Sequence, residues 1–510
     1  MSLHGTEARL AAGDERSPDS VGVPSSRAHQ AEARDRGWTP FLPPLALLFL
    51  LWCATRRDWG PGGAFVPYLG AAVCFLGLLP ALRWGALRRS HPDRVGRTPF
   101  LPVLGVLYAL YFGSPVLFDD TFGVETLRWS VAGVERTLWI ALAGWVALLL
   151  GWSLASSWLT SLQPVRLELD WQRARAVLPA LLTVGFLALF AERMLPIPGA
   201  LTQPLRFLQM LFQAGLAMLL LLFFDGQLSR GMTRLLWFAL IPGYLFVQVG
   251  HGSVAQLAYA GVFLMLVTWG AGRRVPLALL GTGALAVLLM RGNVHAFRDQ
   301  VWAEDGAAAE AGLWERSVLF VEMLSTRFEE EPGEVFGDAF EVVSARVAHL
   351  GTFTHVVELT PAHVPYWKGE TYATLPTTWI PRVLWPDKPS KQIGQAFGHR
   401  YQLIADHDRT TAVNLPIPVE LYANFGFTGF TFGMLGLGVL YFLLDRWLNS
   451  PRAGTGTLVI GCILFSRLIL IESDFTLVFG AVLQYALLLV LFFRWLGPRR
   501  PAARVRRSLA

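Results

Sequence analysis

Long apolar runs, separated by short charged or Pro/Gly-rich breaks, make up most of the chain. A bilayer core about 30 Å thick needs roughly 20 apolar residues in a helix. By that measure the pattern predicts an all-α polytopic membrane protein with about twelve transmembrane helices. The predicted spans lie near residues 41–55, 64–82, 99–118, 137–159, 176–191, 207–224, 235–250, 254–270, 275–290, 426–444, 455–471 and 475–496.

Arginine is distributed unevenly among the loops between these spans. The loops after the second, fourth and eighth spans and the C-terminal tail contain arginine clusters, in residues 83–97, 166–175, 273–274 and 499–507. Loops of the other parity are poor in arginine or acidic. Because short cytoplasmic loops carry the excess of basic residues, both termini are predicted to be cytoplasmic and residues 291–424 to face the periplasm. A bacterial inner membrane is the expected location.

The remaining segments complete the predicted organisation. Residues 1–40 are polar, have no signal-peptide core and are expected to form a disordered cytoplasmic tail. Spans one to nine occupy 41–290, a periplasmic loop or cap occupies 291–424, spans ten to twelve occupy 425–496, and 497–510 is a basic tail. In the loop, Phe336, Phe340 and Val343 follow a helical period and predict short amphipathic helices. Six prolines between 361 and 389 predict an extended, turning segment in the second half.

Composition agrees with a membrane protein. Hydrophobic residues make up 53% of the 510 residues and charged residues 16%, against roughly 25% charged in soluble domains. This argues against a soluble enzyme, a disordered regulator or a nucleic-acid-binding domain. The net charge of +6 is assigned to topology, so no nucleic-acid partner is expected.

Common catalytic motifs and metal sites are missing from the sequence. It has no GxxxxGK[ST], HExxH, GxSxG or CxxC motif, which argues against nucleotide hydrolysis and zinc proteolysis. The three cysteines lie in apolar runs, and the pair His399 and His407, eight residues apart with mixed neighbours, is a weak signal for a metal. No metal or cofactor is expected.

A dense polar segment, residues 368–429, is the main candidate for chemistry. Its cations suit an anionic group such as a pyrophosphate, its aromatic rings suit sugars, and its carboxylates suit proton transfer. Prolines hold Arg382 and Asp387 in one geometry. Trp379 and Trp385 are equally well explained as membrane-interface anchors. The charged residues are Lys368, Glu370, Arg382, Asp387, Lys388, Lys391, Arg400, Asp406, Asp408, Arg409 and Glu420.

A charge lies well inside the predicted span 455–471. Arg467 is four residues inside the predicted outer end of the span 455–471. Because a charge in the bilayer is costly, such a residue usually faces a cavity or a partner. Two interpretations stay open for Arg467: the side chain faces a functional cavity, or it snorkels to the membrane interface.

Four motifs in the polar segment resemble a known family. The runs GETY, IPRVLWPDKP, GQAFGHRY and ELYANFGFTG are similar to the periplasmic loop of Wzy-type O-antigen or exopolysaccharide repeat-unit polymerases. The resemblance covers roughly residues 340–440, and the rest of the chain only through hydropathy and topology.

The resemblance implies an inverting, metal-independent glycosyltransferase at the periplasmic face. It would transfer a glycan from undecaprenyl pyrophosphate to a second lipid-linked repeat unit, beside a flippase and a chain-length regulator of the same pathway. Glu420 and Glu370 become the candidate bases, with Glu420 preferred. The candidate pyrophosphate or substrate contacts are Arg382, Lys388, Arg400, Arg409, Arg467, Asp387, Tyr422 and Asn424. For Asn424 taken alone, capping of the helix of span ten is the preferred role.

Three other functions remain open at this stage. A polysaccharide flippase or transporter shares the plan of twelve spans with both ends inside, although no internal repeat is visible. A related O-antigen-ligase-type enzyme uses the same lipid donor. A non-catalytic assembly subunit would use the charged loop for protein docking.

Overall fold

The computed structural model describes residues 42–55, 63–91, 95–117, 129–159, 161–195, 197–249, 254–275, 348–380, 393–409, 411–469 and 471–498, with residue 385 and isolated residues between 297 and 329. The predicted span 275–290, the periodicity at Phe336 and most of both predicted tails lie outside the described residues. The chain divides into two units, Met1–Leu45 and Ala46–Ala510, and the packing described below belongs to the second.

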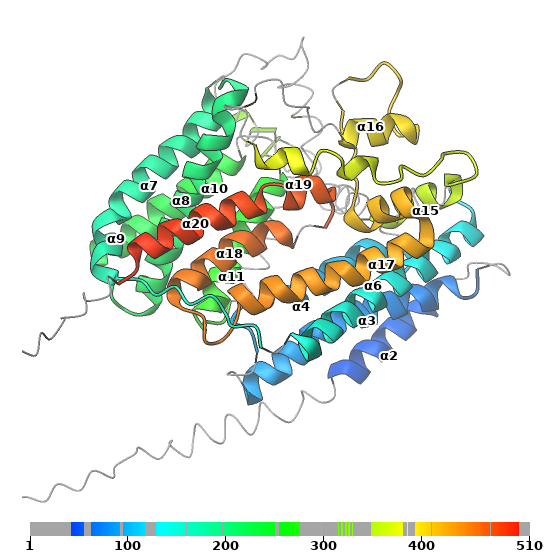
Figure 1. The fold of residues 1–510 in the computed structure, drawn as a ribbon, viewed down its shortest axis with the longest axis horizontal. Helices are drawn as coiled ribbons and strands as arrows, with labels where there is room; N and C mark the ends of the chain where they lie inside the picture. Colours follow the sequence, from blue (N-terminus) through cyan, green and yellow to red (C-terminus); the bar gives the residue numbers. More distant parts are fainter. Residues whose placement is uncertain are drawn as a thin grey trace, which may run out of the picture. The chain divides into compact units, whose positions relative to one another are not determined.

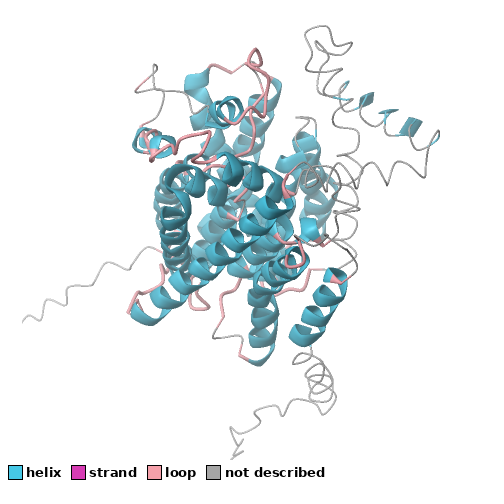
Figure 2. Ribbon diagram, turned by 90° about the vertical axis from the view of Figure 1, so that its right-hand side faces the viewer, coloured by secondary structure: helices cyan, strands magenta, loops and turns pink. Residues whose placement is uncertain are grey.

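The described part of the chain consists of helices and loops, without a strand (Figures 1 and 2). The helices, in chain order, are α2 (Leu42–Ala54), α3 (Val66–Ser90), α4 (Phe100–Phe112), η3 (Ser114–Val116), α6 (Val131–Trp158), α7 (Trp171–Met194), α8 (Gly199–Phe224), α9 (Arg230–Leu235), the π-helix η5 (Leu236–Leu240), α10 (Ile241–Val249), α11 (Val254–Gly270), α15 (His349–Leu359), η6 (Glu370–Tyr372), η7 (Pro376–Trp379), α16 (Ile393–Arg400), α17 (Ile417–Leu448), α18 (Thr455–Leu468), α19 (Phe475–Phe479) and α20 (Val482–Leu496).

Six stretches among the described residues are long and apolar enough to cross a membrane: Val66–Ser90, Val131–Trp158, Trp171–Glu192, Leu201–Phe224, Ile417–Leu448 and Phe475–Leu496. Four further apolar helices have 10–17 residues. The all-helical fold is therefore confirmed, and the length and composition of these helices agree with a membrane protein. The finer count of twelve spans stays a prediction, since a helix of ten to seventeen residues is shorter than the usual spanning length.

Helices α6 and α17 pack along each other and, with α3, α4 and α15, form one group (Figure 1). Glycines allow the two backbones to approach closely. A Cβ atom at Gly151 of α6 would lie 2.0 Å from the Leu435 carbonyl oxygen, and one at Gly438 of α17 would lie 2.0 Å from that of Leu148. Small residues at such contacts are typical of membrane helix pairs, where close packing replaces the hydrophobic effect.

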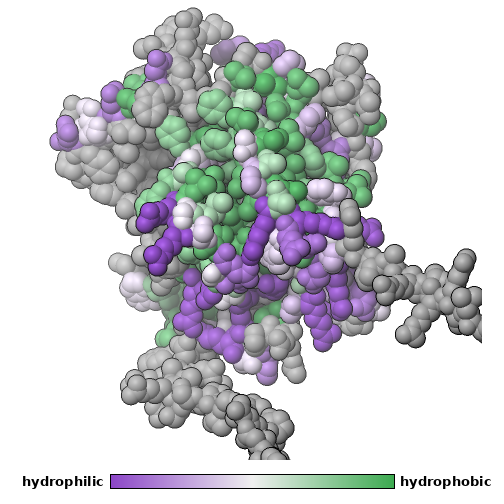
Figure 3. Space-filling view, turned by 90° about the vertical axis from the view of Figure 1, so that its left-hand side faces the viewer, coloured by the Kyte–Doolittle hydropathy of each residue, from purple (hydrophilic) through white to green (hydrophobic). Residues whose placement is uncertain are grey.

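Arginines gather where several helices begin or end, and we call this region the arginine-rich end: Arg88, Arg97, Arg173, Arg273 and Arg446. Their guanidinium groups donate to backbone carbonyls of Trp269, Gly270, Gly497, Phe224 and Leu162, respectively. The carbonyls at a helix C-terminus have no partner within the helix and carry partial negative charge, so cations stabilise them there. Figure 3 shows a hydrophobic surface bordered by hydrophilic residues.

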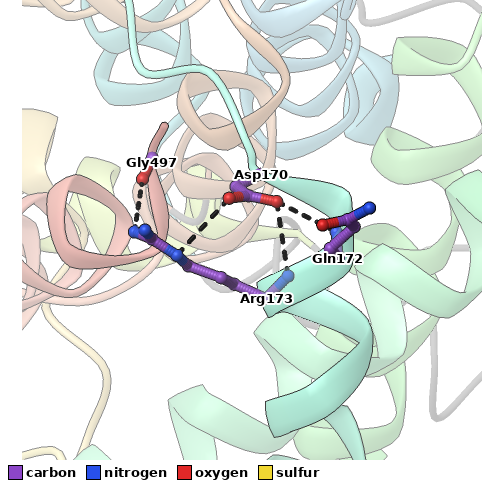
Figure 4. A network of polar contacts seen from close by, with 4 residues as sticks. All are labelled: Asp170, Gln172, Arg173 and Gly497. Atoms are coloured by element: carbon purple, nitrogen blue, oxygen red, sulfur yellow. Dashed lines mark hydrogen bonds and ion pairs between the residues drawn. The ribbon is translucent and has the colours of Figure 1, made fainter. Parts of the chain in front are cut away.

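The start of α7 is tied to the end of α20 at this end (Figure 4). Asp170 caps α7 by accepting from the N–H groups of Gln172 and Arg173, and its carboxylate pairs with the Arg173 side chain at 3.4 Å. Arg173 also donates to the Gly497 carbonyl at 3.1 Å. The predicted grouping of arginines from separate loops is thus seen as a spatial cluster.

The described part of the predicted cap runs from α15 to α17. After α15 the chain turns through η6 and η7, and the short helix α16 precedes α17. Turns were predicted for this proline-rich segment and are present. In residues 360–380, however, two 3₁₀ helices replace part of the extended conformation that was predicted. One of them, η7, begins with Pro376, a residue that a helix accepts in its first turn.

Candidate functional site

A tight turn, Trp367–Thr371, lies directly on the first two turns of α17. The N–H of Trp367 donates to the Ala423 carbonyl and that of Lys368 to the Asn424 carbonyl, both at 3.1 Å. Lys368 and Gly369 have positive φ values of 52° and 91°, a backbone conformation that glycine adopts without strain. The GETY motif is therefore attached to the ELYANFG motif, although about fifty residues separate them in sequence.

Asn424 holds this turn in place. Its Oδ1 accepts from the Gly369 N–H at 2.8 Å, and its Nδ2 donates to Thr371 Oγ1 at 2.9 Å and to the Glu420 carbonyl at 2.8 Å. The side chain is 1% exposed. The predicted role of Asn424 as a helix cap is wrong, because the amide bonds the turn across from α17. Both of its amide hydrogens are engaged inside the protein.

Gly426 breaks α17 just beyond this contact. Its φ of 64° and ψ of −165° interrupt the helix, and this region of backbone conformation is essentially restricted to glycine. A Cβ atom here would lie 2.6 Å from the Tyr366 hydroxyl. The break therefore separates Glu420 and Asn424 from the rest of the long apolar helix.

Glu420 is completely buried between α17 and α19. Its exposed fraction is 0%, and its Oε2 accepts from the N–H of Phe475, the first residue of α19, at 2.6 Å. Its Oε1 has no hydrogen-bond partner among the described residues. Asp474 caps the same helix by accepting from Leu477 at 2.8 Å. One carboxylate oxygen of Glu420 thus anchors α19, and the other remains available for a proton or a ligand.

Tyr372 lies beside this carboxylate. Its ring stacks on Phe425 at 6.0 Å and meets Phe475 edge-on at 5.9 Å. Burial, helped by the negative charges of Glu420 and Asp474, raises the pKa of the Tyr372 phenol. The phenol therefore stays protonated, and its hydroxyl is buried without a hydrogen-bond partner among the described residues. We call Glu420, Asn424, Thr371 and Tyr372 the Glu420 cluster.

A second polar region, the glutamine pocket, lies among α8, α10, α11 and α18. It is a cavity of about 40 Å³ lined by Gln209, Gln213, Gln248, Gln256, Tyr244, Tyr259, Ser466, Arg467 and Leu189. Gln213 donates to the Tyr244 hydroxyl at 2.9 Å. The Oε1 atoms of Gln213 and Gln248 are buried with no hydrogen-bond partner among the described residues. Such acceptors require water or the hydroxyl of a ligand.

Arg467 is the cation of the glutamine pocket. Its side chain is exposed, and its guanidinium lies over the Tyr485 ring at 5.6 Å. The position of Arg467 in the lining of this cavity therefore favours a functional cavity over a snorkelling side chain. The adjacent residue of α20, Gln484, donates to the Thr378 carbonyl at 2.8 Å and bonds Gln203 of α8. These bonds connect η7, α8 and α20 beside the pocket.

The other predicted residues are spread over the loop surface and the core. Glu370 and Arg409 are exposed. Arg400 donates to the Pro365 carbonyl at 2.8 Å and lies over the Trp367 ring at 4.5 Å. Tyr422 is buried against Phe353 at 5.9 Å between ring centroids. The structure therefore brings Glu420 and Asn424 together, and neither Glu370 nor Arg400 bonds to them. Arg382, Asp387 and Lys388 lie outside the described residues.

Sequence reasoning missed two sets of polar residues, one inside predicted spans and one just before the predicted span 137–159. The glutamines of the pocket are one group, and Gln209 and Gln213 on one helix face were the available signal. The other is Arg136 of α6, which lines an open groove of about 530 Å³ with Trp139 and Phe427. The glutamines are uncharged, and Arg136 has a single charged neighbour, Glu135, so a search for large charge clusters passes over both.

Residues 257–496 match the family described as Domain of unknown function (DUF8712). The matched region runs from α11 to the end of α20 and includes every residue that the sequence singled out for the site. No curated protein and no solved structure matches the chain.

Proposed function

We propose that this chain is a membrane-embedded glycosyltransferase that lengthens a polysaccharide from oligosaccharide repeat units carried on undecaprenyl pyrophosphate. The observation that carries the proposal is the glutamine pocket, where Arg467 lies among amide and phenol groups inside apolar helices. The family resemblance of the polar segment 368–429 supports the same class of substrate. The active face is the periplasmic side of a bacterial inner membrane, with both termini in the cytoplasm.

Each part of the pocket suits one part of a lipid-linked sugar. A guanidinium binds phosphate oxygens through two parallel hydrogen bonds. Amide and phenol groups bind sugar hydroxyls, and the buried Oε1 atoms of Gln213 and Gln248 are acceptors in need of such donors. A cavity of about 40 Å³ holds about three water molecules at some 10–15 Å³ each. It therefore fits the polar edge of a sugar, with the rest of the glycan outside.

The proposed reaction is a displacement at the anomeric carbon of the donor. The acceptor hydroxyl forms the new glycosidic C–O bond while the C–O bond to the pyrophosphate breaks. A carboxylate accepts the hydroxyl proton, and Glu420 is the preferred base because its Oε1 is unpartnered. The leaving pyrophosphate gains negative charge, which Arg467 stabilises. Since Glu420 is fully buried, η6 or α19 must move for an acceptor to reach it.

The test is chain growth in cells that carry a deletion of the gene. Loss of the gene is expected to leave single repeat units on the carrier or surface. Complete loss of export would instead favour the flippase, and unattached long chains the ligase. Restored cells with Arg467→Gln are expected to leave single units, although the protein inserts at a normal level. The matched control is Arg494→Gln, an exposed arginine on α20, and long chains from Arg467→Gln cells would refute the assigned role.

The proposed orientation has its own measurement. A reporter fused near residue 310, active only in the periplasm, is expected to be active. Cytoplasmic activity there would overturn the proposed topology, but it would not test the role of the glutamine pocket.

A further inference from the structure

A groove of about 640 Å³ lies at the arginine-rich end, between the ends of α3, α6 and α17 and the start of α4. It is far from the residues assigned to glycosyl transfer. Glu420 is near the first residue of α17 and Arg446 near the last, so at 1.5 Å per residue about 40 Å of helix separates them. The groove is therefore separate from the Glu420 cluster, and its lining shares no residue with that of the glutamine pocket.

Two cations from different helices line this groove. Arg83 of α3 is exposed, and Arg446 of α17 is half-buried, with its Nε donating to the Leu162 carbonyl at 3.1 Å. The carboxylate in the lining is Asp445, whose Oδ1 accepts from Asn449 Nδ2 at 2.7 Å. Arg88 and Arg97 lie nearby and donate to backbone carbonyls. The lining thus carries one more positive than negative charge.

Most of the remaining lining is apolar or aromatic, and its neutral polar residues are Thr98, Ser153, Ser156, Asn449 and Ser450. Leu79, Leu101, Leu149 and Phe442 provide aliphatic and ring surface, together with Trp84 and Trp152. The Trp84 indole donates to the Gly96 carbonyl at 3.3 Å, and Trp152 meets Phe442 edge-on at 5.6 Å. Tryptophan side chains near the ends of membrane helices typically lie at the level of the lipid headgroups. An amphiphile fits this surface better than a fully soluble anion.

We propose that this groove is a binding site for an anionic phospholipid of the adjacent leaflet. Its phosphate contacts the guanidinium groups of Arg83 and Arg446, and its acyl chain lies against Leu101, Leu149 and Phe442. Basic pockets between membrane helices bind anionic headgroups in this way, because the headgroup charge is matched at the depth where the lipid already resides. The bound lipid would connect α3 to α17, whose ends both contribute residues to the groove.

The experiment uses the full-length protein in phosphatidylcholine nanodiscs or neutral detergent, titrated with a fluorescent phosphatidylglycerol. Saturable binding is expected, with displacement by unlabelled phosphatidylglycerol and not by phosphatidylcholine. Displacement by phosphatidylcholine at equal concentration would overturn the headgroup assignment. Displacement by soluble glycerol phosphate at equal concentration would show a site for free phosphate and overturn the lipid assignment.

Variants locate the site. Arg83→Gln is expected to weaken binding about fivefold, the factor for one basic residue at an anionic surface, while Arg83→Lys retains most of it. Arg83 is exposed, so the substitution spares the fold. The matched control is Arg230→Gln, an exposed arginine at the start of α9 that is outside the groove. Equal affinity of Arg83→Gln and the unmodified protein would refute the proposal.

Discussion

Replacing Asn424 by alanine tests whether the turn Trp367–Thr371 depends on this single side chain. The substitution removes three hydrogen bonds, to Gly369, Thr371 and the Glu420 carbonyl. At a net of about 1 kcal/mol each, the loss is about 3 kcal/mol. The two backbone bonds from Trp367 and Lys368 to α17 remain, so we expect the turn to open locally while the membrane helices stay folded.

Local opening can be measured by limited proteolysis. Lys368 is exposed, but a protease needs the chain around it to detach from α17. A loss of about 3 kcal/mol raises the population of the open turn about a hundredfold. Tryptic cleavage after Lys368 should accelerate by a similar factor, whereas cleavage after the exposed Arg409 in the same sample serves as the internal reference.

The matched control is Thr431→Ala, which removes one exposed hydrogen bond, to the Phe427 carbonyl, from the same helix. It should leave cleavage after Lys368 unchanged. If Asn424→Ala gives the same cleavage rate as the unmodified protein, the turn is held by its backbone bonds alone. The argument that Asn424 positions the GETY motif would then be refuted.

Three further substitutions test other parts of the structure. Gly426→Ala should destabilise the protein by about 1–3 kcal/mol, because the φ of 64° and ψ of −165° are strained for alanine; a lower melting temperature checks this, and an unchanged one would contradict it. Asn449→Leu should lower the free energy of unfolding by at least as much, because the Asn449 side chain makes four hydrogen bonds to Thr98 and Asp445. An unchanged melting temperature would contradict this expectation. Glu420→Gln should retain the acceptor for the Phe475 N–H, and so the melting temperature, while chain growth stops; continued growth would remove Glu420 as the base.

Much of the candidate site could be placed from the sequence, but its organisation could not. The motifs GETY and ELYANFG and the residue Arg467 were singled out from the sequence as candidates for the site. The sequence did not show that Asn424 bonds Gly369, or that the Thr476 hydroxyl reaches the Thr371 carbonyl at 3.3 Å. The second contact joins residues about a hundred positions apart. Its partners are selected by how η6 and α19 pack, which no local pattern records.

By itself, the sequence determined that this is a helical membrane protein and that its arginines gather at one end of the helices. Hydropathy and loop charge are local properties, because each span partitions into the bilayer largely on its own residues. Only the tertiary structure decided that Glu420 is buried against α19, and that glutamines from α8, α10 and α11 meet Arg467 of α18 in one pocket. In an apolar medium a lone polar residue must find a partner on another helix, so helix packing, and not sequence spacing, sets which residues form the site.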